Sequence, residues 1–185
     1  MDHKTRCRWC NINNPLYVDY HDTEWCRKNI NEHYLYEMLI LESFQAGLSW
    51  ECILNKREAF RKAFDQFTPT LVASYNDDKI NTLMQNTGIV RNRRKIQAAI
   101  RNSKIFLDIA KEYGSFYHYL CRFTNDATIY EIDKTTSSLS DSISKDLIKR
   151  GMTFVGSTII YSYLQAIGVI VSHESECFLH HPSKE

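Results

Sequence analysis

Apolar residues recur at intervals of three and four along most of this chain, the spacing that places side chains on one face of an α-helix. The segment 34–44 shows it well, with Leu35, Met38 and Leu39 at that spacing. Similar patterns predict helices at 53–64, 69–72, 77–88, 91–110 and 113–123. Few segments alternate between apolar and polar residues, so the fold class that the pattern favours is an all-α helical bundle.

The segments between the predicted helices show no sign of a domain boundary. Residues 124–141 are rich in Ser and Thr, which is typical of a surface loop. Neither internal repeats nor low-complexity tracts separate one part of the 185 residues from another. We therefore expect a single domain spanning residues 1–185, long enough to bury a sizeable core.

Charge is balanced overall but unevenly placed. Lys plus Arg number 23 and Asp plus Glu 22, so net charge does not point to nucleic acid. No acidic residue occurs between Lys79 and Leu107, however, and this stretch is either a basic binding face or an ordinary solvated helix surface. Its basic residues are Lys79, Arg91, Arg93, Arg94, Lys95, Arg101 and Lys104.

The N-terminus is polar and has no apolar signal segment, and no window is apolar enough to span a membrane. We therefore expect a cytoplasmic protein without membrane association. In a reducing compartment its six Cys are better suited to metal binding or burial than to disulfides.

Two pairs of zinc-type ligands lie at opposite ends of the sequence: Cys7 with His21, and His173 with Cys177. The second pair is four residues apart, so on a helix both side chains would share one face. Four protein ligands leave no open position for a substrate, which indicates one structural Zn ion tying segments 1–25 and 170–181 together. Cys10 could replace His21, and His180 and His181 are further alternatives.

Residues 141–168 have the pattern of a helix-hairpin-helix. A helix bearing Ile143 and Leu147 runs to Gly151, and a second helix begins after Gly156. Exposed amides at the start of the second helix, aided by Ser157 and Thr158, would hold a DNA phosphate. The alternative is an ordinary turn between two packed helices.

The N-terminal third places a carboxylate, Glu42, at the end of the apolar run 38–41. Burying it costs free energy unless a partner compensates its charge. A flat cationic ligand such as an alkylated purine would suit it, with neighbouring aromatic residues as walls. The alternative is an aromatic core in which the Glu42 carboxylate either extends to solvent or pairs with an Arg. The aromatic residues are Trp9, Tyr17, Tyr20, Trp25 and Trp50.

Four blocks together resemble the DNA-3-methyladenine glycosylase I family of the helix-hairpin-helix superfamily. They are Cys7-Arg8-Trp9 with Pro15-Leu16-Tyr17-x-x-Tyr20-His21-Asp22-x-Glu24-Trp25, then Leu41-Glu42-x-x-Gln45-Ala46-Gly47-Leu48-Ser49-Trp50, then Gly88-Ile89-Val90-Arg91-x-Arg93-x-Lys95-Ile96-Gln97-Ala98, and Phe154-Val155-Gly156-Ser157-Thr158. The resemblance runs from Cys7 to Cys177.

The resemblance implies a role for each matched position. By this resemblance Glu42 is the catalytic residue and reads the damaged base with Tyr20, and Trp9, Tyr17 and Trp50 enclose the base. The turn carrying Gly47 and Leu48 enters the duplex, and the hairpin from Gly151 through Gly156 to Ser157 and Thr158 grips a phosphate. The family's zinc ligands fall on Cys7, His21, His173 and Cys177.

The implied activity is excision of 3-methyladenine from alkylated double-stranded DNA by a monomeric enzyme, with free 3-methyladenine as the product. No Asp lies between Gly156 and Cys177 and no Lys lies in the hairpin, so a monofunctional enzyme without a lyase step is expected. The alternatives are a non-catalytic zinc-stapled DNA-binding protein and a glycosylase for another alkylated base. Cys26, where relatives usually have Gly, and segment 27–31 depart from the family pattern.

Overall fold

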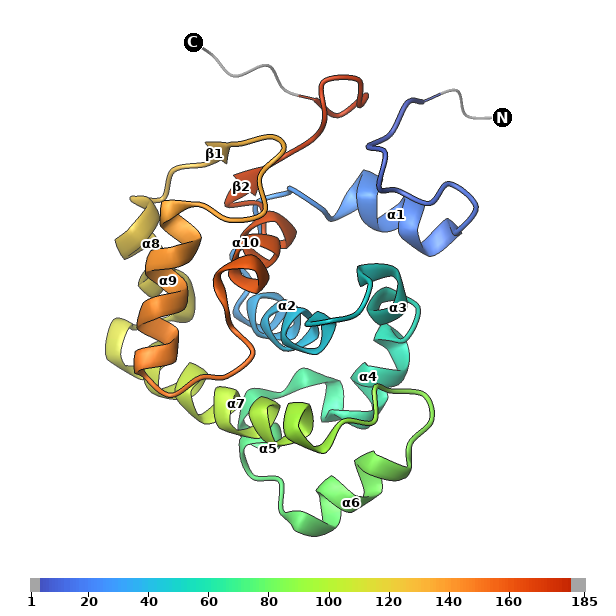
Figure 1. The fold of residues 1–185 in the computed structure, drawn as a ribbon. Coiled ribbons are helices and arrows are strands. Elements are labelled where there is room, and N and C mark those ends of the chain that lie inside the picture. Colours follow the sequence, from blue (N-terminus) through green and yellow to red (C-terminus); the bar gives the residue numbers. More distant parts are fainter. Residues whose placement is uncertain (1–3, 181–185) are drawn as a thin grey trace.

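The computed structural model describes residues 4–180, and within them the chain is mostly helical (Figure 1). The ten α-helices of this described part are α1 (Pro15–Thr23), α2 (Glu32–Gln45), α3 (Trp50–Leu54), α4 (Arg57–Ala63), α5 (Pro69–Ala73), α6 (Asp77–Gln85), α7 (Arg93–Tyr113), α8 (Phe116–Thr124), α9 (Ser138–Lys149) and α10 (Ser157–Ala166). A 3-10 turn, η1 (Asp65–Phe67), precedes α5, and β1 (Ile129–Tyr130) pairs in parallel with β2 (Ile170–Val171).

Helix α2 lies at the centre, with the other helices arranged around it (Figure 1). All residues from Leu35 to Phe44 are buried. The helix begins after Asn31, whose side chain accepts a hydrogen bond from the Tyr34 amide at 3.1 Å. Because every face of α2 is covered, polar side chains on it, including Glu37 and Glu42, are buried with the apolar ones.

The helices predicted at 34–44, 69–72, 77–88, 91–110 and 113–123 correspond to α2, α5, α6, α7 and α8. The single helix predicted at 53–64 is wrong, because the chain turns at Asn55 and Lys56 between α3 and α4. Helix α1 was not predicted. The loop at 124–141 contains β1 and the start of α9, so the fold is mostly helical rather than purely all-α.

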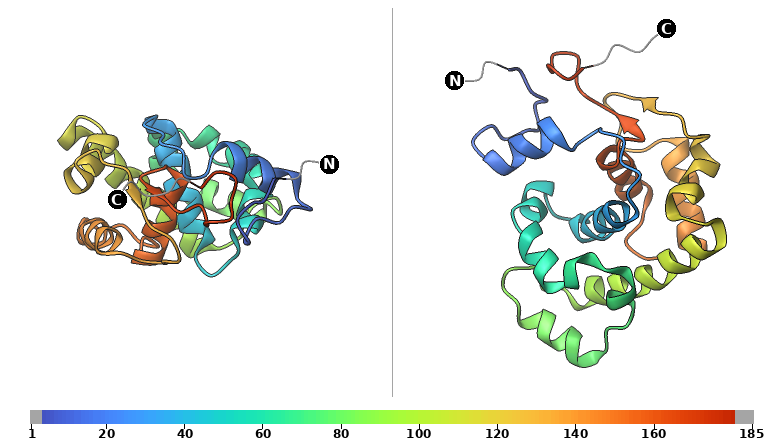
Figure 2. Two further views of the ribbon diagram at one scale, coloured as in Figure 1. Left: turned by 90° about the horizontal axis from the view of Figure 1, so that it is seen from above. Right: turned by 180° about the vertical axis from the view of Figure 1, so that it is seen from behind.

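Both ends of the described chain lie on one side of the molecule (Figure 2). The Phe178 amide donates to the Thr5 carbonyl at 2.9 Å, which joins the two terminal segments directly. Strand β2 follows α10 on this side and is held to β1 by the Ile129 amide, which donates to the Val169 carbonyl at 2.9 Å. No helix within residues 4–180 combines the length and the apolar character needed to cross a bilayer.

Candidate functional site

A cavity of about 260 Å³ lies beside the C-terminal half of α2. Its walls come from α1, α2, α3, α10, the segment after β1 and the chain beyond β2. All five base-binding residues expected from the sequence line it: Trp9, Tyr17, Tyr20, Glu42 and Trp50. The remaining lining residues are Trp25, Gln45, Ile132, Asp133, Lys134, Ser162, Gln165, Ser172 and Glu174.

Glu42 is the unusual member of this pocket. It is 3% exposed, and its Oε2 atom has no hydrogen-bond partner within the described part of the chain. Burial raises the pKa of Glu42 from 4.5 to about 8, so the carboxyl group is largely protonated at neutral pH. The alternative of an Arg partner is therefore wrong, since no described Arg bonds to it.

Aromatic rings surround the carboxyl group. The Tyr20 and Trp50 ring centroids are 5.3 Å apart, and those of Trp9 and Tyr17 are 5.2 Å apart. The Trp50 Nε1 atom is also buried without a partner among residues 4–180. The pocket therefore offers a buried N–H donor and a buried carboxyl oxygen for a ligand that lies flat between rings.

The rim of the pocket is charged, which the sequence did not indicate. Asp133 and Lys134 reach it from the segment after β1, and Lys134 Nζ bonds to Glu131 Oε1 at 3.0 Å. Glu174 also lines the pocket and accepts from the Arg8 amide at 2.9 Å. From sequence, Glu174 is a poor candidate for a catalytic carboxylate because it adjoins His173, an expected metal ligand. These rim residues lie far apart in the chain, so only the fold reveals their proximity.

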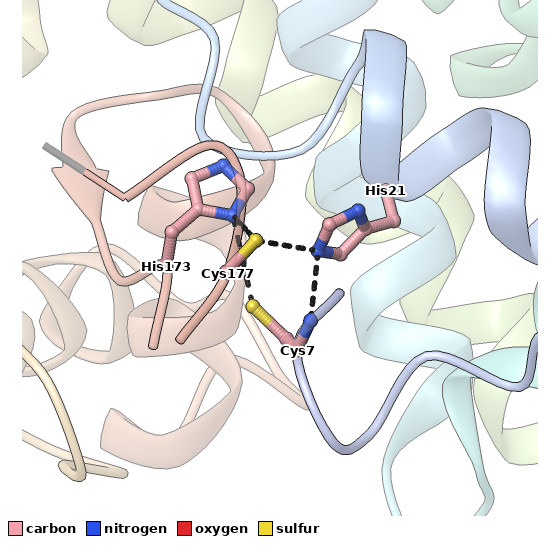
Figure 3. Close-up of side chains that lie close together, drawn as sticks. All are labelled: Cys7, His21, His173 and Cys177. Carbon is pink, nitrogen blue, oxygen red and sulfur yellow. Dashed lines mark hydrogen bonds between the residues drawn. The ribbon is translucent and has the colours of Figure 1, made fainter. Parts of the chain in front are cut away.

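Cys7, His21, His173 and Cys177 form a buried group, called here the His/Cys cluster (Figure 3). Their ligand atoms all lie within 4.8 Å of one another. Cys177 Sγ is 3.5 Å from both His21 Nε2 and His173 Nδ1, and Cys7 Sγ is 3.7 Å from His173 Nδ1. In a tetrahedral zinc site, sulfur and nitrogen ligands lie about 3.6 Å apart. The spacing therefore fits a zinc ion.

The surroundings of the His/Cys cluster also suit a metal. His21 Nδ1 bonds to Asp22 Oδ1 at 2.8 Å, which orients the ring with Nε2 toward the thiols. Asp22 is in turn held by Arg6 at 2.7 Å. Burial raises the pKa of Cys7 to about 12, so thiolates here require a compensating cation.

The rival ligands are placed elsewhere. Cys10 does not belong to the cluster, and its Sγ lies 3.8 Å from the Tyr17 carbonyl. His180 Nδ1 bonds instead to the His173 carbonyl at 2.9 Å, and His181 lies outside the described residues. His173 and Cys177 are not on a helix as assumed; a turn closed by the Cys177 amide and the Glu174 carbonyl brings them together.

Gly47 and Leu48 lie in a tight turn between α2 and α3. The Leu48 amide donates to the Gln45 carbonyl at 2.7 Å, and Gly47 has φ +77°, a left-handed conformation that other residues adopt only with strain. Leu48 is 38% exposed at the tip. The fold thus presents an apolar side chain to solvent next to the pocket wall that Trp50 forms.

The hairpin, residues 151–156, connects α9 to α10. Gly151 has φ +102°, and the Ser144 hydroxyl donates to the Val155 carbonyl at 2.7 Å. Helix α10 has no side-chain cap, and nothing lies within 4 Å of the position that a Gly156 side chain would occupy. Its first amides are therefore accessible to an anion.

One expected phosphate contact has another partner. The Ser157 hydroxyl bonds to the Asp141 carboxylate and to Ser140 Oγ, so it is engaged within the protein. The hairpin's anion-binding capacity therefore resides in backbone amides more than in that hydroxyl, with Thr158 in the first turn of α10.

The basic stretch 79–107 is not one uniform face. Arg91, Arg93 and Arg94 are exposed, but Lys79 Nζ bonds to Asp65 at 3.1 Å. Lys95, assigned to the basic face from sequence, is only 7% exposed and points into the protein. Three arginines are thus exposed around the start of α7, and Arg101 and Lys104 are exposed further along the same helix.

Cys26 lies outside the pocket lining, as do residues 27–31. It has φ +61°, a left-handed backbone conformation that glycine adopts more readily. Its buried Sγ accepts from the Ser172 amide at 3.3 Å, which ties α1's C-terminal side to the segment after β2. The departure from the family pattern thus contributes no lining residue, although Cys26 bonds to the backbone of Ser172, which does line the pocket.

Comparison with known proteins agrees with this arrangement. The family model for methyladenine glycosylase matches residues 9–180. DNA-3-methyladenine glycosylase 1 of Escherichia coli is 41% identical over 178 residues, covering 93% of this chain and 95% of the relative. A crystal structure of 3-methyladenine DNA glycosylase I superposes with a TM-score of 0.91 at 39% identity, covering 96% of this chain and 100% of that chain. The corresponding Staphylococcus aureus protein, studied for its 3-methyladenine recognition, gives a TM-score of 0.89 at 32% identity, covering 95% and 96%.

Proposed function

Since this chain belongs to the methyladenine glycosylase family, we propose that its pocket receives 3-methyladenine flipped out of double-stranded DNA and that the protein hydrolyses the bond between that base and its sugar. Base excision as a DNA-3-methyladenine glycosylase is the activity of the family members that it resembles. The observation that carries the assignment to this pocket is the buried, unpartnered carboxyl group of Glu42 among aromatic rings.

Selectivity follows from the electrostatics of the pocket. A base methylated at N3 is positively charged while it is attached to the sugar, whereas normal adenine is neutral. The cation stabilises the ionised form of Glu42, which burial alone disfavours. The rings of Trp9, Tyr17 and Trp50 stack against the base, and Tyr20 contributes its hydroxyl at the polar edge. Normal adenine lacks the charge that offsets this burial cost.

Cleavage needs little acid assistance with such a substrate. The bond between the sugar C1′ and the base breaks with both electrons moving to the base, which becomes neutral as it leaves. Water then adds to C1′ and loses a proton. The protein's contribution is to hold the flipped base between the rings and next to Glu42, where interactions that grow during cleavage lower the barrier.

The residues at the rim of the pocket favour base removal without subsequent cleavage of the DNA strand. Lys134 is the one lysine among the residues that line the pocket within 4–180, and its Nζ is engaged by Glu131. We expect no covalent enzyme–DNA intermediate. Borohydride should trap no complex with abasic DNA, and a trapped complex lost in Lys134→Gln would overturn the monofunctional assignment.

The DNA contacts come from three places around the pocket. Leu48 fills the gap left by the flipped base, the α10 amides behind Gly156 hold a phosphate, and Arg91, Arg93 and Arg94 add positive charge. The enzyme acts as a monomer on this model, since one chain supplies the pocket, the turn and the hairpin.

The His/Cys cluster holds one structural Zn ion. Cys7, His21, His173 and Cys177 supply all four ligands, so the bound metal would contribute stability and no reactive position. Its role is to join the N-terminal segment, which carries Trp9, to the chain beyond β2.

The decisive experiment is to incubate the protein with methylated duplex DNA and identify the released bases. We expect 3-methyladenine from the parent and a large loss in Glu42→Gln. Release of mainly 7-methylguanine would indicate a glycosylase for another base. No release by a folded protein that still binds DNA would indicate the non-catalytic DNA-binding alternative.

A further inference from the structure

The sequence block 88–98 has no contact with the pocket, although it is one of the blocks that carry the family resemblance. None of residues 88–98, all of which the structure describes, lines the cavity. We propose that α7 is a brace that fixes the turn 45–48 relative to the hairpin 151–156, and that Lys95 is the positioning residue that holds Leu48 for insertion into DNA. This inference rests on the proposed function.

Lys95 bonds directly to the end of α2. Its Nζ donates to the Phe44 carbonyl at 2.7 Å and to the Ala46 carbonyl at 2.6 Å. No carboxylate within residues 4–180 pairs with it, and burial lowers its pKa. The compensation for the buried ammonium comes from the carbonyl end of α2, where the helix dipole and the unpaired carbonyls favour a cation.

This position lets Lys95 control the turn. Phe44 and Ala46 flank the last residue of α2, and Leu48 follows only two residues after Ala46. Gly47 gives the turn a flexible backbone, and its side-chain position is surrounded by open space, so no packing there restrains it. The turn is closed by the Leu48 amide, which donates to the Gln45 carbonyl at 2.7 Å, and by Gln45 Nε2, which donates to the Leu48 carbonyl at 3.1 Å. The two bonds from Lys95 are the ones that attach this closed turn to α7.

A second side chain of α7 holds the hairpin in the same manner. Asn102 is fully buried, and its side-chain amide donates to the Thr153 carbonyl at 2.9 Å. The Thr153 amide donates back to Asn102 Oδ1 at 3.0 Å. This reciprocal pair satisfies both backbone groups of Thr153 and fixes the hairpin to α7.

The two attachments share one face of one helix. Lys95 and Asn102 are seven residues apart, which is two helical turns. The Phe154 ring of the hairpin lies 5.8 Å from Lys95 Nζ, so the hairpin also contacts the residue that holds the turn. The duplex contacts of Leu48 and of the α10 amides must be correctly spaced to act together, and α7 sets that spacing.

The test compares Lys95→Met with the parent in two binding measurements. Methionine keeps the straight apolar stem but removes all donors. Affinity for a duplex containing a stable abasic analogue should fall about tenfold or more, because two charge-assisted hydrogen bonds position the inserted residue. Affinity for free 3-methyladenine, measured by tryptophan fluorescence, should stay within about twofold. Lys111→Met, the same change at an exposed position of α7, should alter neither.

A double-mutant cycle adds a readout that general destabilisation would not give. In a Leu48→Ala background, Lys95→Met should cause little additional loss of duplex affinity, because the side chain that Lys95 positions is already absent. Full additivity would overturn the proposal. So would a parallel loss of free-base binding, which would show that Lys95 supports the whole of α2.

If Lys95→Met does not fold, Lys95→Arg is the variant that tests the proposal. It keeps a cation and donors, so its duplex affinity should recover to within about threefold of the parent if donation to the carbonyls is what matters. Duplex affinity that stays low in a folded Lys95→Arg protein, although the guanidinium can donate to both carbonyls, would refute the proposal. Loss of both binding activities would refute it. A parent protein that releases no 3-methyladenine would refute the proposed function instead.

Discussion

The stability of Glu42→Gln relative to the parent should increase as the pH rises from acidic to alkaline. In the folded protein burial raises the pKa of Glu42 from 4.5 to about 8. Between these values the folded state binds a proton that the unfolded chain has released. The free energy of unfolding of the parent therefore decreases as pH rises from about 5 to about 8 and is constant above that range. Gln carries no titrating proton.

The size of the effect follows from the same values. Each pKa unit corresponds to about 1.4 kcal/mol, so the rise from 4.5 to about 8 corresponds to about 5 kcal/mol for the ionised form. The stability difference between Glu42→Gln and the parent should therefore shift by about 4 kcal/mol in favour of the variant from pH 5 to pH 8. For a chain of this size that amounts to roughly 8–16 °C in the difference of Tm values.

The assay is thermal or denaturant unfolding of both proteins from pH 5 to pH 9. All other ionisable groups are common to both proteins, so the difference between them isolates Glu42. Glu42→Leu is the control: its difference from the parent should follow the same pH dependence with a constant offset, because only the titration is common to both variants. A difference in Tm that stays constant over this range would refute a buried, uncompensated carboxyl group.

Three further predictions concern other parts of the molecule. Cys177→Ser should lower bound zinc, measured by elemental analysis, and lower Tm, while the folded fraction keeps its activity; equal loss of activity in fully folded protein would contradict a structural role. Gly156→Val should fold normally, because its φ of −61° suits any residue and the side chain meets open space, yet it should weaken duplex binding several-fold at unchanged free-base affinity; unchanged duplex binding would show that no phosphate lies there. Arg57→Met should cost about 2–3 kcal/mol in urea unfolding, because buried Glu37 then keeps only its 2.9 Å pair with Arg61 and the bond to Glu24 is lost; a cost below about 1 kcal/mol would show that this network contributes little.

Helices with ordinary packing were predictable from sequence, and the exceptions have identifiable causes. Helix α2 and helix α7 carry the apolar spacing that their neighbours require. Helix α1 buries Tyr17, Tyr20 and His21, which face the pocket and the His/Cys cluster, so it lacks an apolar stripe. The break between α3 and α4 has neither Pro nor Gly to mark it. Strands of two residues carry too little pattern to detect.

Some residues of the site were likewise predictable from sequence and others were not. Glu42 was predictable as a pocket residue because a carboxylate at the end of an apolar run is unusual, and Trp50 because it lies in a block that resembles the family. Asp133 reaches the pocket rim from a segment that has no motif of its own. Lys95 was misread as a surface charge, because its partners are backbone carbonyls some fifty residues away and a sequence does not display carbonyls. When backbone carbonyls compensate a buried charge, no partner residue in the sequence indicates that the charge is buried.

The pocket and the turn 45–48 are joined through α2. The hairpin 151–156 is joined to neither of them through α2. Glu42 lies on α2, and the turn 45–48 begins at the last residue of that helix, so the chain links them directly and Lys95 holds the point where they meet. The hairpin continues from α9, where the Met152 amide donates to the Leu147 carbonyl at 3.0 Å, and the side chains of Asn102 from α7 and Ser144 from α9 also hold it. A change in α7 should therefore alter the grip on DNA without altering which base is read. A shift of the α2 terminus should alter both, because the residue that reads the base and the residue that replaces it in the duplex then move together.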